Sequence, residues 1–322
     1  MRMIDQAAVH RLLDYPGLIE ALRAMFRAGC ELPVRHHHTV KTAGAPDGTL
    51  LIMPAWRAGG HIGVKIVTVF PGNGARDLPG VMGQYLLLDA TTGEPRALVD
   101  GTALTARRTG AASALAATYL AREDARTLLM VGTGTLAPHL IGAHAAARPL
   151  RRVLIWGRDA AKARALAARL NAPSLEVGAT DNLEHAVAQA DIVSCATLSH
   201  AALILGRWLK PGQHVDLVGG FTPEMREADD EAIRRARVYV DTLDGALKEA
   251  GDVVQPLATG VIARSDVHGD LFGLTRGAIA GRGARDEITL FKSVGTALED
   301  LAAAELAYGR AEAAETLHGA GK

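Results

Sequence analysis

The chain has 322 residues, of which 48% are hydrophobic and 22% charged, a balance that suits a globular protein of two ordinary domains or one large one. Its 35 Lys and Arg residues are matched by 35 Asp and Glu residues, so the formal net charge is zero. This excludes the broad positive field that binding to nucleic acid or an anionic membrane needs.

The cysteines and the amino terminus indicate the cellular compartment of the protein. No disulfide framework or zinc-binding spacing can be built from Cys30 and Cys195, so no metal is predicted, and Cys195 in the apolar run DIVSCAT is expected to be a small buried residue. The amino terminus lacks a signal peptide, and no stretch approaches a membrane span. We therefore expect a cytoplasmic protein.

The first part of the chain predicts one helix, at residues 16–28, and then several long strands rich in β-branched and apolar residues. Turn sequences such as PGNG and ATTGEP separate these strands. We expect a mixed or antiparallel sheet that forms its own domain, followed by a linking helix at 104–121. The predicted strands are residues 48–56, 63–70, 81–90 and 94–100.

A lysine stands in the second of these strands, HIGVKIVTVF. Because side chains alternate along a strand, Lys65 shares a face with Val67 and Val69. Two interpretations are open from the strand alone. Either Lys65 lies at a strand end, with its stem packed and its ammonium in water, or it is a cation placed in a pocket to hold an anion.

From residue 128 onward, short apolar strands alternate with helices of about ten residues, which predicts parallel βαβ units and a doubly wound sheet. The last predicted helix, EITLFKSVGTALEDLAAAELA, has Leu290, Val294, Leu298 and Leu301 on one stripe. The expected fold class is therefore α/β, with a Rossmann-type doubly wound parallel sheet plus a mixed α+β domain. The predicted strands lie within residues 128–131, 151–156, 174–177, 191–197, 214–220 and 237–242.

The segment VGTGTLA fits the dinucleotide-binding pattern between a strand and a helix. Gly132 permits the tight turn, Gly134 lets the backbone approach a pyrophosphate, and Ala137 allows close packing of helix on strand. The helix start would present free N–H groups to the phosphates. Residues assigned to the cofactor here are Gly132, Thr133, Gly134, Thr135 and Leu136.

The end of the second strand of this region bears on cofactor choice. It reads Trp156-Gly157-Arg158-Asp159, with Lys162 one helical turn on. An arginine suits the 2′-phosphate of NADPH, so NADPH is predicted as the preferred cofactor and NADH stays open. Asp159 is either a ribose acceptor or a helix N-cap. Residues assigned to the cofactor here are Gly157, Arg158 and Lys162, and Thr197 after the DIVSCA run is assigned as well.

Six segments spread in order over almost the whole chain are distinctive: LPVRHHHT, GVKIVTVFPGN, LDGTALTARRTGAAS, VGTGTLA, PGQHVDLVGGFTPEMREAD and DEITLFKSVGTALEDLAAA. Through these segments the chain as a whole resembles the ornithine cyclodeaminase/mu-crystallin family. The resemblance implies a homodimer, with a substrate-binding and dimerisation domain of residues 1–110 with 292–322 and a Rossmann NADP-binding domain of residues 111–291. The final helix would return to the first domain.

The resemblance also assigns residues to the substrate. It implies that Arg35, Lys65 and Arg108 hold the substrate carboxylate and that Thr109 lies by the cofactor, which favours the pocket interpretation of Lys65. Charge-assisted hydrogen bonds are what a carboxylate in a closed site needs. Lys65 is also the predicted catalytic residue: it either binds the carboxylate or helps to protonate the substrate nitrogen, and geometry decides between the two. His36, His37 and His38 are alternative proton relays, and Glu224 and Asp229 are expected at a helix start.

Two positions depart from the cyclodeaminase pattern. Phe221 stands where these enzymes have an aspartate, and Leu51 stands where they have a glutamate. The chain is therefore more similar to the ketimine reductases, which implies reduction of Δ1-pyrroline-2-carboxylate to L-proline, with Δ1-piperideine-2-carboxylate and L-pipecolate as a second pair. The alternatives are an alanine or N-alkyl amino-acid dehydrogenase, an ornithine cyclodeaminase, and a non-catalytic protein that binds NADPH and a small acid.

Overall fold

The computed structural model describes residues 1–319, and the chain divides into two compact units. Unit 1 contains Met1–Arg108 and the segment from Ala297 onward, and unit 2 contains Thr109–Thr296. None of the helices within the described residues is both long enough and apolar enough to cross a membrane.

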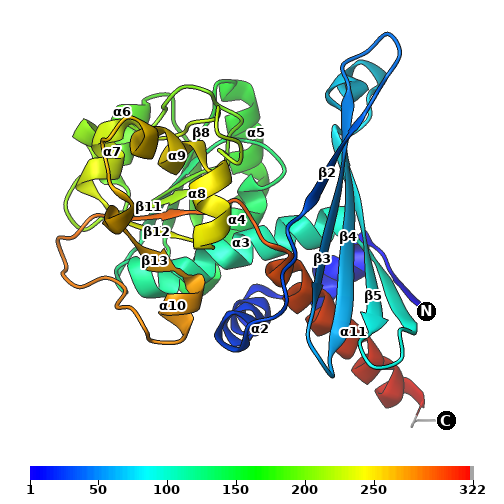
Figure 1. Ribbon diagram of the computed structural model, residues 1–322. Helices are drawn as coiled ribbons and strands as arrows, with labels where there is room; N and C mark the ends of the chain where they lie inside the picture. The colour runs from blue at the N-terminus through cyan, green and yellow to red at the C-terminus, as the bar shows by residue number, and fades with distance from the viewer. Residues whose placement is uncertain (320–322) are drawn as a thin grey trace. The chain divides into compact units, whose positions relative to one another are not determined.

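Unit 1 is built on a six-stranded sheet in the order β1-β6-β5-β4-β3-β2 (Figure 1). β1 is parallel to β6 and the other neighbouring strands are antiparallel, so the sheet is mixed, as the sequence predicts. The histidine-rich β2 was not predicted, because its exposed polar residues give no apolar alternation. The strands are β1 (Arg2–Ile4), β2 (His36–Val40), β3 (Gly48–Trp56), β4 (His61–Val69), β5 (Val81–Asp89) and β6 (Pro95–Asp100).

Helices cover one face of this sheet. The long helix α11 contacts β3, β4 and β5 and also packs on α2. The sheet residues Met53, Lys65 and Tyr85 are buried. Asp14 caps α2 by accepting a hydrogen bond from the amide of Gly17, 2.8 Å away. The helices of unit 1 are α1 (Gln6–Leu12), α2 (Tyr15–Ala28), the 3₁₀ turn η1 (Pro71–Arg76) and α11 (Ala297–Gly319).

Unit 2 is a doubly wound sheet of eight parallel strands, which confirms the predicted Rossmann-type class. Both faces are buried: Leu129 and Val131 belong to one apolar cluster, and Leu128 and Met130 to another. This explains why the strands read as continuous apolar runs. In sheet order the strands are β13 (Val267–Asp270), β12 (Arg237–Val240), β14 (Thr289–Lys292), β11 (His214–Leu217), β10 (Ile192–Cys195), β7 (Thr127–Val131), β8 (Arg152–Trp156) and β9 (Glu176–Ala179).

The helices of unit 2 begin with α3, which starts in unit 1 and continues into unit 2. They are α3 (Gly101–Leu120), α4 (Ala137–Ala147), α5 (Ala160–Leu170), α6 (Leu183–Gln189), η2 (Gly206–Trp208), α7 (Asp230–Arg235), α8 (Leu243–Glu249), α9 (Gly251–Ala258), η3 (Arg264–Asp266) and α10 (Leu271–Thr275). Figure 1 shows helices of unit 2 on both sides of its sheet.

The final helix differs from the sequence prediction. Its expected first turns form β14, a fully buried strand between β11 and β12, and α11 begins only at Ala297. The apolar run ITLF fits a central parallel strand as well as a helix, and Gly295, with φ 79°, separates strand from helix. Unit 1 therefore resumes at Ala297, five residues after the predicted boundary at 292.

Candidate functional site

The glycine loop between β7 and α4 has the form that phosphate binding needs. Gly132 has a φ of 119°, and a Cβ there would lie 2.5 Å from the carbonyl oxygen of Ala196, so only glycine fits. Within the described part of the chain, the amides of Gly134, Thr135 and Leu136 have no hydrogen-bond partner. The space over Gly134 is open. Free amides facing open space before a helix start suit an anion such as a pyrophosphate.

Sheet register brings the predicted cofactor segments to one edge. Val131 pairs with Trp156 on β8 and with Cys195 on β10, so the three strands end level with one another. The segments that follow, at 132–136, 157–158 and 197, therefore lie at the carboxyl ends of neighbouring strands. The strand order reverses between β7 and β10, which is where doubly wound sheets bind nucleotides.

The end of β8 carries two free cations. Arg158 and Lys162 are exposed, and neither side chain has an ion-pair or hydrogen-bond partner in the part of the chain that the structure describes. Gly157 lies against Thr133, since a Cβ on it would be 2.7 Å from the Thr133 methyl carbon. Asp159 caps α5 by accepting from the amides of Ala161 and Lys162 with Oδ1, as the N-cap interpretation expects.

Two threonines complete the predicted cofactor set. Thr109 lies on α3 beside Gly110, where an added Cβ would be 2.8 Å from the carbonyl oxygen of His139 in α4. Thr109 is therefore placed near the start of α4. Thr197 follows β10, and both its amide and its hydroxyl donate to Glu227 Oε1, at 2.7 and 2.8 Å.

Glu227 belongs to a buried charge cluster that sequence reasoning missed. Its second oxygen, Oε2, accepts from the amide of Gly219 at 2.7 Å, so one carboxylate joins the loops after β10 and β11. Lys292 Nζ lies 3.3 Å from Asp252 Oδ2 and 4.0 Å from Glu227 Oε2, and all three side chains are fully buried. Burial raises the pKa of Glu227, Lys292 lowers it and Asp252 raises it.

In unit 1, two of the three predicted substrate cations meet in a second buried cluster. Lys65 Nζ lies 2.6 Å from Asp300 Oδ2, and Arg108 donates from Nε to Asp300 Oδ1 at 2.9 Å. Arg108 also donates to Glu299 Oε2 at 2.5 Å. Two cations and two carboxylates make this cluster formally neutral. An ion cluster of this kind is what allows charges to remain in a region closed to water.

Burial and neighbouring charges act in opposite directions on these cations. Burial lowers the pKa of Lys65 to about 8, although Asp300 acts to raise it. For Arg108, burial also lowers the pKa, but Asp300 and Glu299 raise it above its ordinary value. Arg108 therefore stays cationic, while Lys65 is able to gain and lose a proton near neutral pH.

The sheet register shows where Arg35 lies relative to Lys65. It directly precedes His36, which pairs with Ile52, and the next residue of β3, Met53, pairs with Lys65. Arg35 and Lys65 thus flank the same row of the sheet, with Met53 between them. Arg35 is half-buried, whereas His36, His37 and His38 are all exposed.

Known proteins resemble this chain in sequence and in structure. The sequence model of the ornithine cyclodeaminase/mu-crystallin family matches residues 2–315. The chain belongs to this family. It is 42% identical over 290 residues to the Δ1-pyrroline-2-carboxylate reductase of Paracoccus denitrificans, covering 90% of each chain.

Two solved structures resemble this family member along nearly its whole length. One is the Δ1-pyrroline-2-carboxylate reductase of Thermococcus litoralis in complex with NADH and L-proline, with a TM-score of 0.91, 32% identity and 98% of each chain covered. The other is an archaeal alanine dehydrogenase dimer with bound NAD, with a TM-score of 0.89, 28% identity and coverage of 98% and 97%.

Two apolar residues, Leu51 and Phe221, mark the positions at which this family member departs from the cyclodeaminase pattern. Leu51 lies on β3 two residues before Met53, so it shares the sheet face of Lys65. Phe221 follows β11 and is 46% exposed, and Leu198, three residues after β10, is 68% exposed. Large exposed apolar side chains thus follow both of the strands that Glu227 joins.

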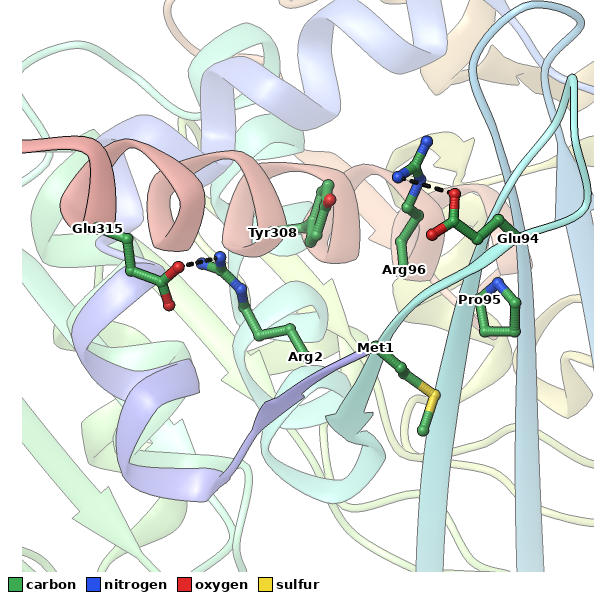
Figure 2. A pocket seen from close by; sticks show the side chains of 7 residues that line it. All are labelled: Met1, Arg2, Glu94, Pro95, Arg96, Tyr308 and Glu315. Atoms are coloured by element: carbon green, nitrogen blue, oxygen red, sulfur yellow. Dashed lines mark hydrogen bonds and ion pairs between the residues drawn. The ribbon is translucent and has the colours of Figure 1, made fainter. Parts of the chain in front are cut away.

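A hollow of about 360 Å³ on the surface of unit 1 is separate from these clusters (Figure 2). Its two arginines are already paired, Arg2 with Glu315 at 2.6 Å and Arg96 with Glu94 at 3.2 Å. None of the predicted site residues lines it, so we assign it no role. It is lined by Met1, Arg2, Glu94, Pro95, Arg96, Tyr308 and Glu315.

The Lys292 cluster yields a stability prediction. Lys292→Met removes the cation and leaves Glu227 and Asp252 as uncompensated buried carboxylates. We expect the free energy of unfolding to fall by about 3–5 kcal/mol, the usual cost of breaking a buried ion pair. Urea unfolding measures this change. Lys248→Met, at an exposed lysine, is the control and should stay within about 0.5 kcal/mol of the native protein. Equal stability of the two variants would contradict the prediction.

Proposed function

We propose that this protein is an oxidoreductase that reduces Δ1-pyrroline-2-carboxylate to L-proline, with NADPH as the preferred reductant. The observation that carries the proposal is the buried cluster of Lys65 and Arg108, which share the carboxylate of Asp300. Lys65 in this cluster has a pKa of about 8. The sheet face that carries Lys65 has Leu51 in place of a carboxylate. The names of the Paracoccus and Thermococcus relatives support the same reaction.

The chemistry needs few protein groups. Arg35, Lys65 and Arg108 supply charge-assisted hydrogen bonds to the substrate carboxylate. A bound reduced nicotinamide supplies a hydride to the carbon of the C=N bond. Lys65 supplies the proton that the nitrogen takes as the π bond breaks, so one C–H and one N–H bond form. A carboxylate base is not needed, which is consistent with Phe221 and Leu51.

Three alternatives share these features. An alanine or N-alkyl amino-acid dehydrogenase would use a similar fold, as the archaeal alanine dehydrogenase illustrates. An ornithine cyclodeaminase would have to work without the aspartate that Phe221 replaces. A non-catalytic protein would bind NADPH and a small acid without turnover. Turnover of different substrates separates all of them.

The first test of the function measures NADPH oxidation. Turnover is expected with Δ1-pyrroline-2-carboxylate, with the six-membered Δ1-piperideine-2-carboxylate as a second substrate, and not with pyruvate plus ammonia; ornithine with NAD should release no ammonia.

Lys65→Met keeps most of the stem of the side chain and removes the charge. It should cost on the order of 2–4 kcal/mol of transition-state stabilisation, about 30- to 1000-fold in kcat/KM.

The control for this test is Lys41→Met, at a lysine whose side chain is 85% exposed, which should leave kcat/KM unchanged. NADPH affinity should change little in either variant, because the assigned phosphate-binding residues belong to unit 2. Near-native turnover by a folded Lys65→Met protein would refute the role of Lys65. If the native protein also failed to reduce either ketimine, the proposed function itself would be refuted.

The preference for NADPH is proposed on the two free cations after β8. Arg158 and Lys162 are exposed and unpaired within the described residues, as a phosphate-binding pair would be before its ligand arrives. Asp159 is committed to capping α5, so its carboxylate is engaged by backbone amides. The Thermococcus relative was solved with NADH, which makes the preference of this chain a point to measure.

Arg158→Asp tests this preference. The exchange replaces a phosphate partner with a carboxylate that repels the 2′-phosphate and accepts from ribose hydroxyls. We expect the NADPH/NADH ratio of kcat/KM to fall at least tenfold, about 1.4 kcal/mol, as expected for the loss of a charge-assisted contact. Arg169→Asp, at an exposed arginine near the end of α5, should leave the ratio unchanged. An unaltered ratio in Arg158→Asp would remove the basis for the assignment.

We also propose that the chain forms a homodimer through the open face of the unit 1 sheet. Lys65 points to the face on which α11 lies, and the neighbouring residues of β4 point to the other. On that other face Ile66, paired with Ile52, is 45% exposed, and Met82 is 41% exposed. A contiguous exposed apolar face is typical of an interface. The alanine dehydrogenase relative is itself a dimer.

Light scattering on purified protein tests the dimer. The native chain should have twice the mass of the monomer. Ile66→Asp places a charge in the open face and should shift the mass toward the monomer at low micromolar concentration, because burying an unpaired carboxylate is costly. Leu198→Asp, at an exposed leucine of unit 2, is the control and should remain a dimer. A monomeric native protein would contradict the proposal.

A further inference from the structure

One carboxylate is shared by both buried cations of unit 1. Asp300 lies in the first turn of α11 and is fully buried. Its Oδ2 is 2.6 Å from Lys65 Nζ, and its Oδ1 accepts from Arg108 Nε at 2.9 Å. Glu299, the preceding residue, is equally buried and contacts Arg108 at 2.5 Å. Asp300 therefore contacts, with its two oxygens, both the residue that can lose a proton and the residue that cannot.

Few titratable groups face Lys65, and each has a defined effect. From α11, Asp300 and Glu299 favour the ammonium, and from α3, Arg108 disfavours it. From β5, Tyr85 pairs with Lys65 across the sheet, and burial together with Asp300 raises the pKa of its phenol, so it stays neutral. Arg35 stands at the end of the same row of the sheet. Asp300 is the strongest of the groups that oppose the effect of burial on Lys65.

We propose that Asp300 is a positioning residue for this reaction: it fixes the direction of the Lys65 ammonium and keeps it protonated until the substrate nitrogen takes the proton. This inference rests on the proposed function. As hydride from the reduced nicotinamide adds to carbon, the C=N π bond breaks and the proton passes from Lys65 Nζ to nitrogen. Lys65 becomes a neutral amine, Arg108 continues to donate to Asp300, and a proton from solvent restores the ammonium.

The pH dependence of kcat/KM separates this role from a purely structural one. A proton donor is lost as pH rises through its pKa, so kcat/KM should fall above about pH 8 in the native protein. In Asp300→Asn the Lys65 ammonium loses the charge that most favours it, so kcat/KM should begin to fall at a pH about one unit lower or more. Glu299→Gln is the matched control, and its fall should shift by less than half as much.

The substrate ionises identically in all assays, so differences between variants report on the protein. A folded Asp300→Asn protein whose pH profile superimposes on the native one would overturn the inference. So would a Glu299→Gln profile that shifts as far as that of Asp300→Asn, because Asp300 would then be only one of two equivalent neutralising charges.

A second measurement needs no variant of Asp300 and no turnover. In native protein labelled with ¹³C-aspartate and ¹⁵N-lysine, the Lys65 amine signal is assigned by its loss in Lys65→Met. One aspartate carboxyl signal should show a step at the same midpoint as Lys65, near pH 8, and lose that step in Lys65→Met. Absence of such a step would overturn the inference. A coupled step in a protein that reduces no ketimine would instead refute the proposed function alone.

Discussion

The ion cluster of unit 1 is the constraint on which the proposed substrate chemistry depends. A lysine and an arginine cannot remain charged in a buried position unless counter-charges are built in beside them. Helix α11 supplies both counter-charges from adjacent residues, Glu299 and Asp300, in its first turn. The same helix packs on β3, β4 and β5, so the fold of unit 1 and the charge state of Lys65 have one structural cause.

The proposed cofactor site of unit 2 differs from this cluster, because its assigned cations are exposed to solvent and need no buried counter-charge. Here the ends of three parallel strands place the segments after β7, β8 and β10 at one edge, and the loop before helix α4 has the amides of Gly134, Thr135 and Leu136 without a hydrogen-bond partner among the described residues. Glu227 adds rigidity by accepting from Thr197 and Gly219 on two neighbouring loops. The cations Arg158 and Lys162 remain exposed, so no internal carboxylate is needed beside them.

Sequence reasoning reached the features that local pattern determines. The βαβ alternation and the glycine loop each depend on residues within a few positions of one another, and the cap at Asp159 was one of two interpretations left open. It failed where long-range pairing decides. The run ITLFK has an apolar stripe compatible with a helix, yet it becomes β14 because β11 and β12 offer a central position that only a strand can fill. Glu299 and Asp300 were missed because their partners lie nearly 200 residues away. Two adjacent acids between the apolar residues 297–298 and 301–304 were the available signal.

The contrast between the two sets of cations gives their roles a common physical basis. A cation that meets a phosphate at a solvent-exposed edge loses little hydration while it waits, so Arg158 can be unpaired. A cation that meets a carboxylate in a closed region must be neutralised in advance, and its partner then competes with the substrate. In the neutral cluster of Lys65, Arg108, Glu299 and Asp300, an added anion gains most if it also carries a basic atom that can take the Lys65 proton. A cyclic ketimine acid has both a carboxylate and a basic ring nitrogen, which fits the proposed proton transfer from Lys65, whereas pyruvate has no basic nitrogen.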